Sequence, residues 1–168
     1  MNQKNRKAPI FLMTVGIPGS GKSRWVENHI PEDKFKIVCP DLIRKEVTGR
    51  ISDVSQDERV WSIAKSRVID ALRQGKNVVL DATNVNQKDR VKFVQKLPPH
   101  CLYAKRFEVN PALAKKRIQK DIESEKDRSH VPKKVVDSMH EQFQQYASKK
   151  QLKEEGFKLI DNSEELLS

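Results

Sequence analysis

One octapeptide constrains the fold of this chain more than any other feature. Residues 16–23 are Gly-Ile-Pro-Gly-Ser-Gly-Lys-Ser, and they match the pattern G-x-x-x-x-G-K-[ST] at every fixed position. The residues before the octapeptide, 10–15, are an apolar run typical of a buried strand in a parallel sheet. Its last residue and those that follow, 23–29, predict a helix, which Pro31 ends. Because the pattern wraps phosphates in this strand, loop and helix context, we predict an α/β fold.

The residue types of this loop suit a nucleoside triphosphate. Glycines let the backbone wind tightly, so that successive N–H groups face phosphate oxygens, and the following helix adds its partial positive end. We expect Lys22 to neutralise the β- and γ-phosphates and Ser23 to bind Mg²⁺. The expected nucleotide-binding residues are Gly16, Pro18, Gly19, Ser20, Gly21, Lys22 and Ser23. The alternative is a glycine-rich turn that binds nothing, and the complete match in its context argues against it.

The rest of the chain alternates between apolar runs and helical stretches. Further strands are predicted at residues 35–39, 78–80, 102–109 and 157–160. Helices are predicted at residues 41–47, 53–74, 86–97, 110–125 and 132–153. At 168 residues the chain is one domain, given about 150 residues per domain. We therefore predict a parallel sheet of about five strands flanked by helices, with a basic tail at 1–8 and a mobile lid around 118–131.

Two carboxylates follow predicted strands. Asp81 ends the apolar run 78–80 and is placed to hold Mg²⁺ beside the phosphate loop; the alternative is an ordinary turn aspartate. Asp41 follows the strand at 35–39, at the edge where open sheets bind ligands, so we expect it to act as a general base on a phosphate acceptor. Arg44 lies on the same helical face and is suited to hold a phosphate of the acceptor. Their spacing fits equally well a helix N-cap with a salt-bridge partner.

Basic residues near the lid are candidates to neutralise the negative charge of the transition state. A lid that closes over the transferring phosphoryl group would exclude water and supply positive charge. Arg128 is the first candidate for that catalytic role, and Lys126 is the second. Arg117, on the preceding helix, is placed to stack on the base of ATP. For each of these residues the alternative is a solvent-facing helix charge.

The charge balance favours an anionic partner. Lys and Arg number 33 against 23 Asp and Glu, which gives a net charge of +10. This charge suits a nucleotide, a nucleic acid or an anionic lipid, although a surface tuned for solubility is the alternative. A membrane-spanning helix needs about 20 apolar residues, and every apolar run of the chain is much shorter than that. The start of the chain also lacks the pattern of a secretory leader. We expect a cytoplasmic protein with no membrane partner.

Together these motifs resemble the 5′-kinase domain of phage polynucleotide kinase and, more broadly, the small P-loop kinases related to it. The resemblance covers about residues 10–146. It is carried by Pro18 to Ser23, by Asp41-x-x-Arg44, by Asp81-Ala-Thr-Asn-Val-Asn with Arg90 following, and by Val131-Pro132 before a helix containing Ser138-Met139. It implies a P-loop kinase fold, ATP and Mg²⁺ at the site, and 5′-hydroxyl ends of DNA or RNA as acceptors. Nothing in the resemblance points to an obligate protein partner. The protein that it implies is intracellular, and a phage genome is one source of such a protein.

The resemblance also implies residue roles. Asp41 would be the general base on a 5′-hydroxyl, Lys22 and Ser23 would hold phosphates and metal, and Arg117 with a basic lid residue would surround ATP. The implied acceptor-binding residues are Arg44, Thr83, Asn84 and Val131. Between Arg117 and Val131 the chain is longer than the family pattern. Arg128 and Lys126 are therefore both candidates for the role of the family's second lid arginine. If the two sequences are aligned without a gap, Asp121 occupies the position of that arginine.

We therefore expect the chain to transfer the γ-phosphate of ATP to 5′-hydroxyl ends of DNA or RNA. Because no Asp-x-Asp motif is present, we expect kinase activity without the phosphatase of the phage enzyme. Two alternatives stay open. One is a kinase of a nucleoside, nucleotide or other small molecule. The other is a nucleotide-binding module with little acceptor chemistry.

Overall fold

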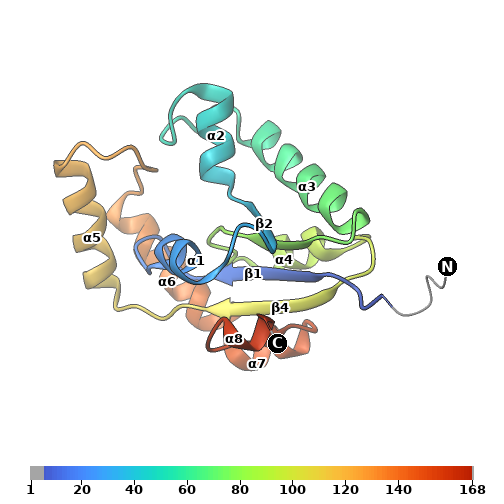
Figure 1. The fold of residues 1–168 in the computed structure, drawn as a ribbon. Helices are drawn as coiled ribbons and strands as arrows, with labels where there is room; N and C mark the ends of the chain where they lie inside the picture. The colour runs from blue at the N-terminus through green and yellow to red at the C-terminus, as the bar shows by residue number, and fades with distance from the viewer. Residues whose placement is uncertain (1–5, 168) are drawn as a thin grey trace.

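The computed structural model describes residues 6–167, and a five-stranded parallel sheet lies at its centre (Figure 1). The predicted basic tail at 1–8 thus falls mostly outside the described residues. The strands are β1 (Ile10–Val15), β2 (Phe35–Val38), β3 (Asn77–Leu80), β4 (Cys101–Arg106) and β5 (Lys158–Leu159). Their order is β2-β3-β1-β4-β5, and every neighbouring pair is parallel. The α/β class and the five strands confirm the sequence prediction.

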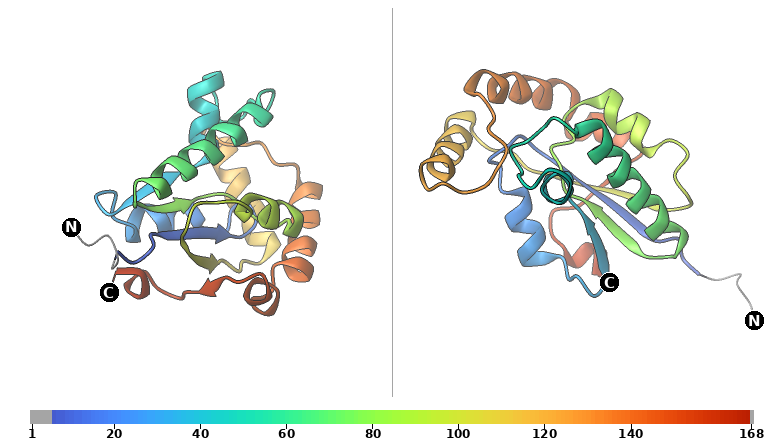
Figure 2. Two further views of the ribbon diagram at one scale, coloured as in Figure 1. Left: turned by 90° about the vertical axis from the view of Figure 1, so that its right-hand side faces the viewer. Right: turned by 90° about the horizontal axis from the view of Figure 1, so that it is seen from above.

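Helices connect the strands and cover both faces of the sheet (Figure 2). They are α1 (Lys22–His29), α2 (Pro40–Thr48), α3 (Asp57–Arg73), α4 (Gln87–Val94), α5 (Pro111–Glu123), α6 (Lys133–Tyr146), α7 (Lys149–Glu154) and α8 (Glu164–Leu167). Side chains set several of the helix starts. Asn86 accepts a hydrogen bond from Asp89 N, and Asn110 accepts one from Ala112 N ahead of Pro111. None of the helices within residues 6–167 is long and apolar enough to cross a membrane.

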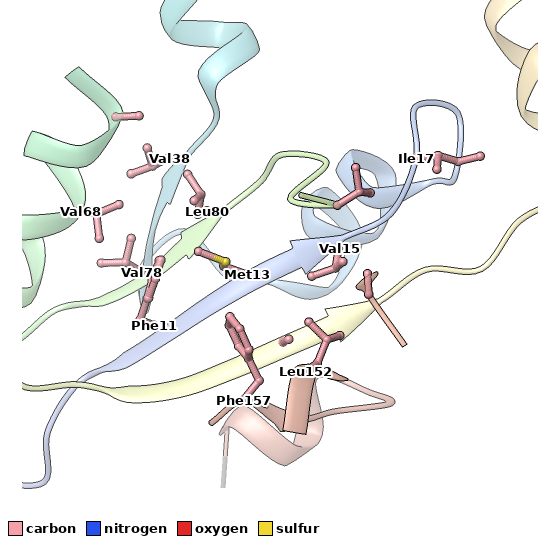
Figure 3. Close-up of a cluster of buried hydrophobic side chains, with 14 of the residues drawn as sticks. Phe11, Met13, Val15, Ile17, Val38, Val68, Val78, Leu80, Leu152 and Phe157 are labelled. Carbon is pink, nitrogen blue, oxygen red and sulfur yellow. The ribbon is translucent and has the colours of Figure 1, made fainter. Parts of the chain in front are cut away.

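The central strand β1 is apolar on both faces because each face packs on helices. Phe11, Met13 and Val15 belong to the larger core cluster, which includes side chains of α3, α5, α6 and α7 (Figure 3). Leu12 points to the other face, where a smaller cluster contains Val26 of α1 and Leu166 of α8. Successive strand side chains alternate between faces, so a strand buried on both faces has a continuous apolar sequence. This packing explains why the apolar run at 10–15 was sufficient to predict strand β1.

Several element boundaries differ from the sequence prediction, and three of these differences have the following form. The single helix expected at 132–153 is wrong: α6 ends at Tyr146 and α7 begins at Lys149, because Ser148 is extended and caps α7 by accepting a hydrogen bond from Gln151 N. The helix expected at 53–74 starts only at Asp57, since Asp53 binds the backbone and hydroxyl of Ser55 in a turn. Strand β4 ends at Arg106 instead of at 109.

A buried ion pair ties the break between α6 and α7 to the rest of the fold. Arg90 of α4 donates from Nε and Nη2 to the carboxylate of Glu155, at 2.9 and 2.8 Å. The same guanidinium donates to Asn84 O at 2.8 Å and to Tyr146 O. The Arg90 side chain is 0% exposed and that of Glu155 is 6% exposed. Arg90 thus joins the turn after β3 to the end of α6 and to α7.

We predict that Glu155→Gln lowers the free energy of unfolding by about 3 to 5 kcal/mol, because it leaves the buried charge of Arg90 uncompensated. Urea denaturation measures the change. The matched control is Glu46→Gln, which removes a carboxylate from an exposed pair with Arg67 at 2.6 Å and should change stability by less than about 1 kcal/mol. Equal effects of the two substitutions would contradict the prediction.

Candidate nucleotide and acceptor site

The loop between β1 and α1 needs glycine at two positions for steric reasons. A Cβ at Gly16 would lie 2.8 Å from Ser20 Oγ and 3.0 Å from the Cβ of Phe107. Gly19 has a φ of +79°, and a Cβ there would lie 2.7 Å from Ala114 O. Gly16 N donates to Thr83 O at 2.9 Å, which joins the loop to the turn after β3. The predicted phosphate loop therefore has a tight backbone that a larger residue would disrupt.

Lys22 is buried inside this loop. Its Nζ donates to Ile17 O at 2.8 Å and to Ser20 Oγ at 3.3 Å, and the residue is 9% exposed. Burial lowers the pKa of Lys22 to about 8, although the nearby carboxylates of Asp81 and Asp41 act in the opposite direction. An ammonium group held by two neutral oxygens has not regained the hydration it lost. The loop therefore presents a partly compensated cation that a phosphate group would stabilise.

Asp81, at the end of β3, lies beside the start of α1. Ser23 Oγ donates to Asp81 Oδ2 at 2.9 Å, and Thr14 Oγ1 lies 3.4 Å from Oδ1. Burial raises the pKa of Asp81, against the hydrogen bond from Ser23 and the charge of Lys22. A desolvated carboxylate beside a hydroxyl is an oxygen-donor pair of the kind that Mg²⁺ prefers. Ser23 and Asp81 therefore fit the metal that the sequence analysis assigned to them.

Asp41 and Arg44 lie on α2, at the carboxyl end of β2. Arg44 Nη1 donates to Asp41 Oδ1 at 2.6 Å. The N-cap of α2 is Cys39, and its side chain makes no cap hydrogen bond, so the alternative role of Asp41 as an N-cap is wrong whereas its ion pair with Arg44 is present. Cys39 precedes Asp41 by two residues, and burial and then the nearby Asp81 carboxylate raise the pKa of its thiol to about 12.

Arg44 has a second carboxylate partner that the sequence analysis missed. Its Nε and Nη2 donate to Asp57 Oδ1 and Oδ2 at 2.7 and 3.1 Å. The Arg44 side chain is only 7% exposed. Burial lowers the pKa of Arg44, but the hydrogen bonds to Asp57 and Asp41 outweigh it and raise the pKa overall. The guanidinium expected to hold an acceptor phosphate is therefore already engaged by the protein.

The connection between α5 and α6 reaches across to α2 (Figures 1 and 2). Arg128 Nη1 donates to Asp121 Oδ2 at 2.6 Å, and the Arg128 charge lies near enough to Lys22 to act against its protonation. Asp127 accepts hydrogen bonds from Ile51 N at 3.1 and 3.3 Å. Ser129 Oγ accepts a hydrogen bond from Arg44 Nη1 at 3.2 Å. Residues 127–129, which we term the lid bridge, thus lie between the phosphate loop and the pair of Asp41 and Arg44. Lys126, the rival candidate, is exposed.

The remaining candidates contact the protein itself. Arg117 Nη1 donates to Gly19 O at 3.0 Å, beside the phosphate loop. Asn84 has a φ of 49° and donates through Nδ2 to Thr14 O at 2.8 Å, which fixes the turn after β3. The Val131 side chain packs against the larger core cluster. Thr83 and Asn84 therefore lie beside the loop, and the acceptor contacts of Thr83, Asn84 and Val131 stay predictions.

Both the sequence and the fold of this chain are similar to those of known proteins. The sequence model of the AAA domain family matches residues 11–146. A chain of the Pnkp1/Rnl/Hen1 RNA repair complex superposes with a TM-score of 0.72 and is 28% identical over 85% of this chain and 46% of the matched one. This chain therefore spans just under half the length of that relative.

Two further solved structures share the fold. A putative kinase from Chloroflexus aurantiacus J-10-fl has a TM-score of 0.63 at 16% identity, over 77% of this chain and 78% of its own. A gluconokinase from Sinorhizobium meliloti 1021 has a TM-score of 0.51 at 19% identity, over 82% and 76%. At these identities the likeness is one of fold, and the fold is that of P-loop kinases.

We predict that ATP affinity falls as the pH rises through about 8. Below its pKa of about 8 Lys22 carries the charge that a phosphate stabilises, and above it binding must take up a proton. Titration calorimetry at about pH 7 and about pH 9 should show up to about tenfold weaker binding at the higher pH, with proton uptake. Lys22→Arg should bind with little pH dependence, and a wild-type affinity that is constant over this range would contradict the account.

We predict that Asp127→Ala exposes the lid bridge. Losing its contacts with Ile51 N should raise the undocked population about 5- to 10-fold, the equivalent of about 1 to 1.5 kcal/mol. Trypsin cleavage after Lys126 and Arg128, followed by mass spectrometry, measures this population when docking is fast. Glu125→Ala, a change at an exposed neighbour, is the control. Equal cleavage rates in the Asp127 variant and the wild type would show that Asp127 does not dock the lid.

Proposed function

We propose that this chain, which belongs to the AAA domain family, is an ATP-dependent kinase that phosphorylates the 5′-hydroxyl ends of DNA or RNA. Its P-loop kinase fold implies nucleotide binding. The single observation that carries the proposal is the geometry of Asp41. This carboxylate lies at the same sheet edge as the buried Lys22, and Oδ2 of Asp41 has no hydrogen-bond partner within residues 6–167.

The donor half of the reaction follows from the phosphate loop. Backbone N–H groups and the ammonium of Lys22 bind the β- and γ-phosphates, and the helix α1 directs its partial positive end toward them. Ser23 and Asp81 would hold Mg²⁺, which would further neutralise the charge of the phosphate oxygens. Arg128 leaves Asp121 and binds the transferring phosphoryl group as the lid bridge closes, and Arg117 packs on the nucleotide.

The acceptor half depends on Asp41. Oδ2 accepts the proton of the 5′-hydroxyl as the hydroxyl oxygen forms a bond to the γ-phosphorus. The bond between the γ-phosphorus and the β,γ-bridging oxygen breaks, and ADP leaves. Most of the acceleration comes from holding the two oxygens in line and neutralising charge.

Two observations support a polynucleotide acceptor. The net charge of +10 favours a polyanion over a neutral metabolite. The relative with 28% identity belongs to the Pnkp1/Rnl/Hen1 RNA repair complex. The fold likeness to a gluconokinase supports the second candidate, a small-molecule kinase on the same scaffold. Both candidates use the same phosphate loop and base and differ only in what approaches Asp41.

We predict that the wild-type protein transfers labelled γ-phosphate to a 5′-hydroxyl oligonucleotide and that Asp41→Asn reduces the rate by about 100-fold or more. The amide cannot accept the proton, and general-base catalysis contributes about 10²- to 10⁴-fold. Asp70→Asn, an exposed carboxylate on α3, is the matched control and should retain wild-type activity. Labelling by Asp41→Asn at the wild-type rate would remove the base assignment.

An acceptor-length series separates the two candidates in the same assay. A polynucleotide kinase should prefer oligonucleotides to nucleosides, and its oligomer affinity should fall steeply with salt because phosphate contacts release counterions. A small-molecule kinase would use nucleosides or sugars at least as well, with little dependence on salt. ATP hydrolysis that no acceptor changes would instead favour a nucleotide-binding module.

A further inference from the structure

Arg44 joins four segments on the acceptor side of the site. Its guanidinium contacts Asp57 of α3, Asp41 of α2, Ile51 O in the α2–α3 connection at 3.2 Å, and Ser129 of the lid bridge. The side chain is almost completely buried. Any change in the orientation of this guanidinium therefore changes its contact with the Asp41 carboxylate, which is half-exposed and has Arg44 as its short contact.

Asp57 controls that orientation. A carboxylate that accepts from both Nε and Nη2 forms a two-bond fork with the planar guanidinium and fixes the plane of the group. In this orientation Arg44 contacts Asp41 through Nη1 alone, and only at Oδ1. Without Asp57, the Arg44 fork would be free to pair with both oxygens of Asp41. Such a pair would occupy Oδ2, the oxygen that the reaction needs.

The charges support the same arrangement. Arg44 carries one positive charge between two carboxylates, so the group Asp41, Arg44 and Asp57 has a net charge of −1. A base that must accept a proton benefits when its buried counterion is shared with a second carboxylate. Resting on the proposed function, we infer that Asp57 is a positioning residue of this kinase, which holds Arg44 so that Oδ2 of Asp41 stays free for the acceptor hydroxyl.

The test compares Asp57→Asn with Glu58→Gln. Glu58 is exposed and lies in the same first turn of α3, so its substitution removes the same charge from the helix start without touching Arg44. Asp57→Asn should lower kcat for a 5′-hydroxyl oligonucleotide by about 10- to 100-fold, as misplacement of a catalytic group does, with the KM for ATP unchanged. Glu58→Gln should match the wild type.

A double-mutant cycle separates positioning from a structural effect. If Asp57 acts through Arg44, then Asp57→Asn causes no further loss of kcat in an Arg44→Gln background. Additive losses, or wild-type kcat in Asp57→Asn when the wild type is active, would overturn the inference.

The orientation of Arg44 has a readout that does not need the reaction. In arginine-labelled protein, the Nε–H signal of Arg44, identified by its loss in Arg44→Gln, should exchange slowly in the wild type and rapidly in Asp57→Ala. Rapid exchange in both proteins would show that Asp57 does not hold the group. A wild type that phosphorylates no 5′-hydroxyl end would refute the proposed function, and this signal would still decide whether Asp57 positions Arg44.

Discussion

Burial of the Lys22 ammonium, whose hydrogen-bond partners are Ile17 O and Ser20 Oγ, is the constraint on which the rest of the site depends. A cation removed from water is costly, and its lowered pKa records that cost. The compensation comes from neighbours that the sheet order supplies. Because β3 lies directly beside β1, Asp81 meets Ser23 and acts on Lys22. The central strand therefore ends where charge is concentrated and poorly solvated, which is where a phosphate chain gains most from binding.

The acceptor side is a second charged centre with a different construction. Its arginine is fully engaged by carboxylates, whereas the lysine of the phosphate loop has only neutral hydrogen-bond partners. The lid bridge joins the two centres: Ser129 contacts Arg44, and the neighbouring Arg128 carries its charge to within reach of Lys22. Any movement of the lid bridge therefore changes the surroundings of both Lys22 and Arg44. Donor and acceptor binding are coupled through it if the kinase proposal holds, and such coupling is reciprocal.

Much of this arrangement could be predicted from sequence because it depends on local signals. The phosphate loop has a strict spacing, and β1 and β3 are apolar runs with no competing helical period. Helix starts at Asn86 and Asn110 carry their own capping residues. The break between α6 and α7 was missed because a continuous helical pattern covers it. What interrupts the helix is the cap at Ser148, supported by Arg106 and Arg90, which donate to Ala147 O and Tyr146 O from other elements.

The same reason explains the functional residues that were missed. Asp57 follows Arg44 by 13 residues, and Ser129 by 85, so no periodicity links them. Arg44 was assigned to the acceptor from its spacing to Asp41, and only the folded structure shows that Asp57 already binds two of its nitrogens. Pairings across elements depend on how α2, α3 and the lid pack, which short-range sequence patterns do not encode.

The central claim is that one edge of the sheet holds a triphosphate in the loop around Lys22 while Asp41 presents a free oxygen to an alcohol. A crystal structure with a non-hydrolysable ATP analogue, Mg²⁺ and a short 5′-hydroxyl oligonucleotide tests it most directly. The account predicts the terminal hydroxyl about 3 Å from Oδ2 of Asp41 and in line with the γ-phosphorus. Triphosphate bound away from the loop, or a 5′ end that does not approach Asp41, would contradict it.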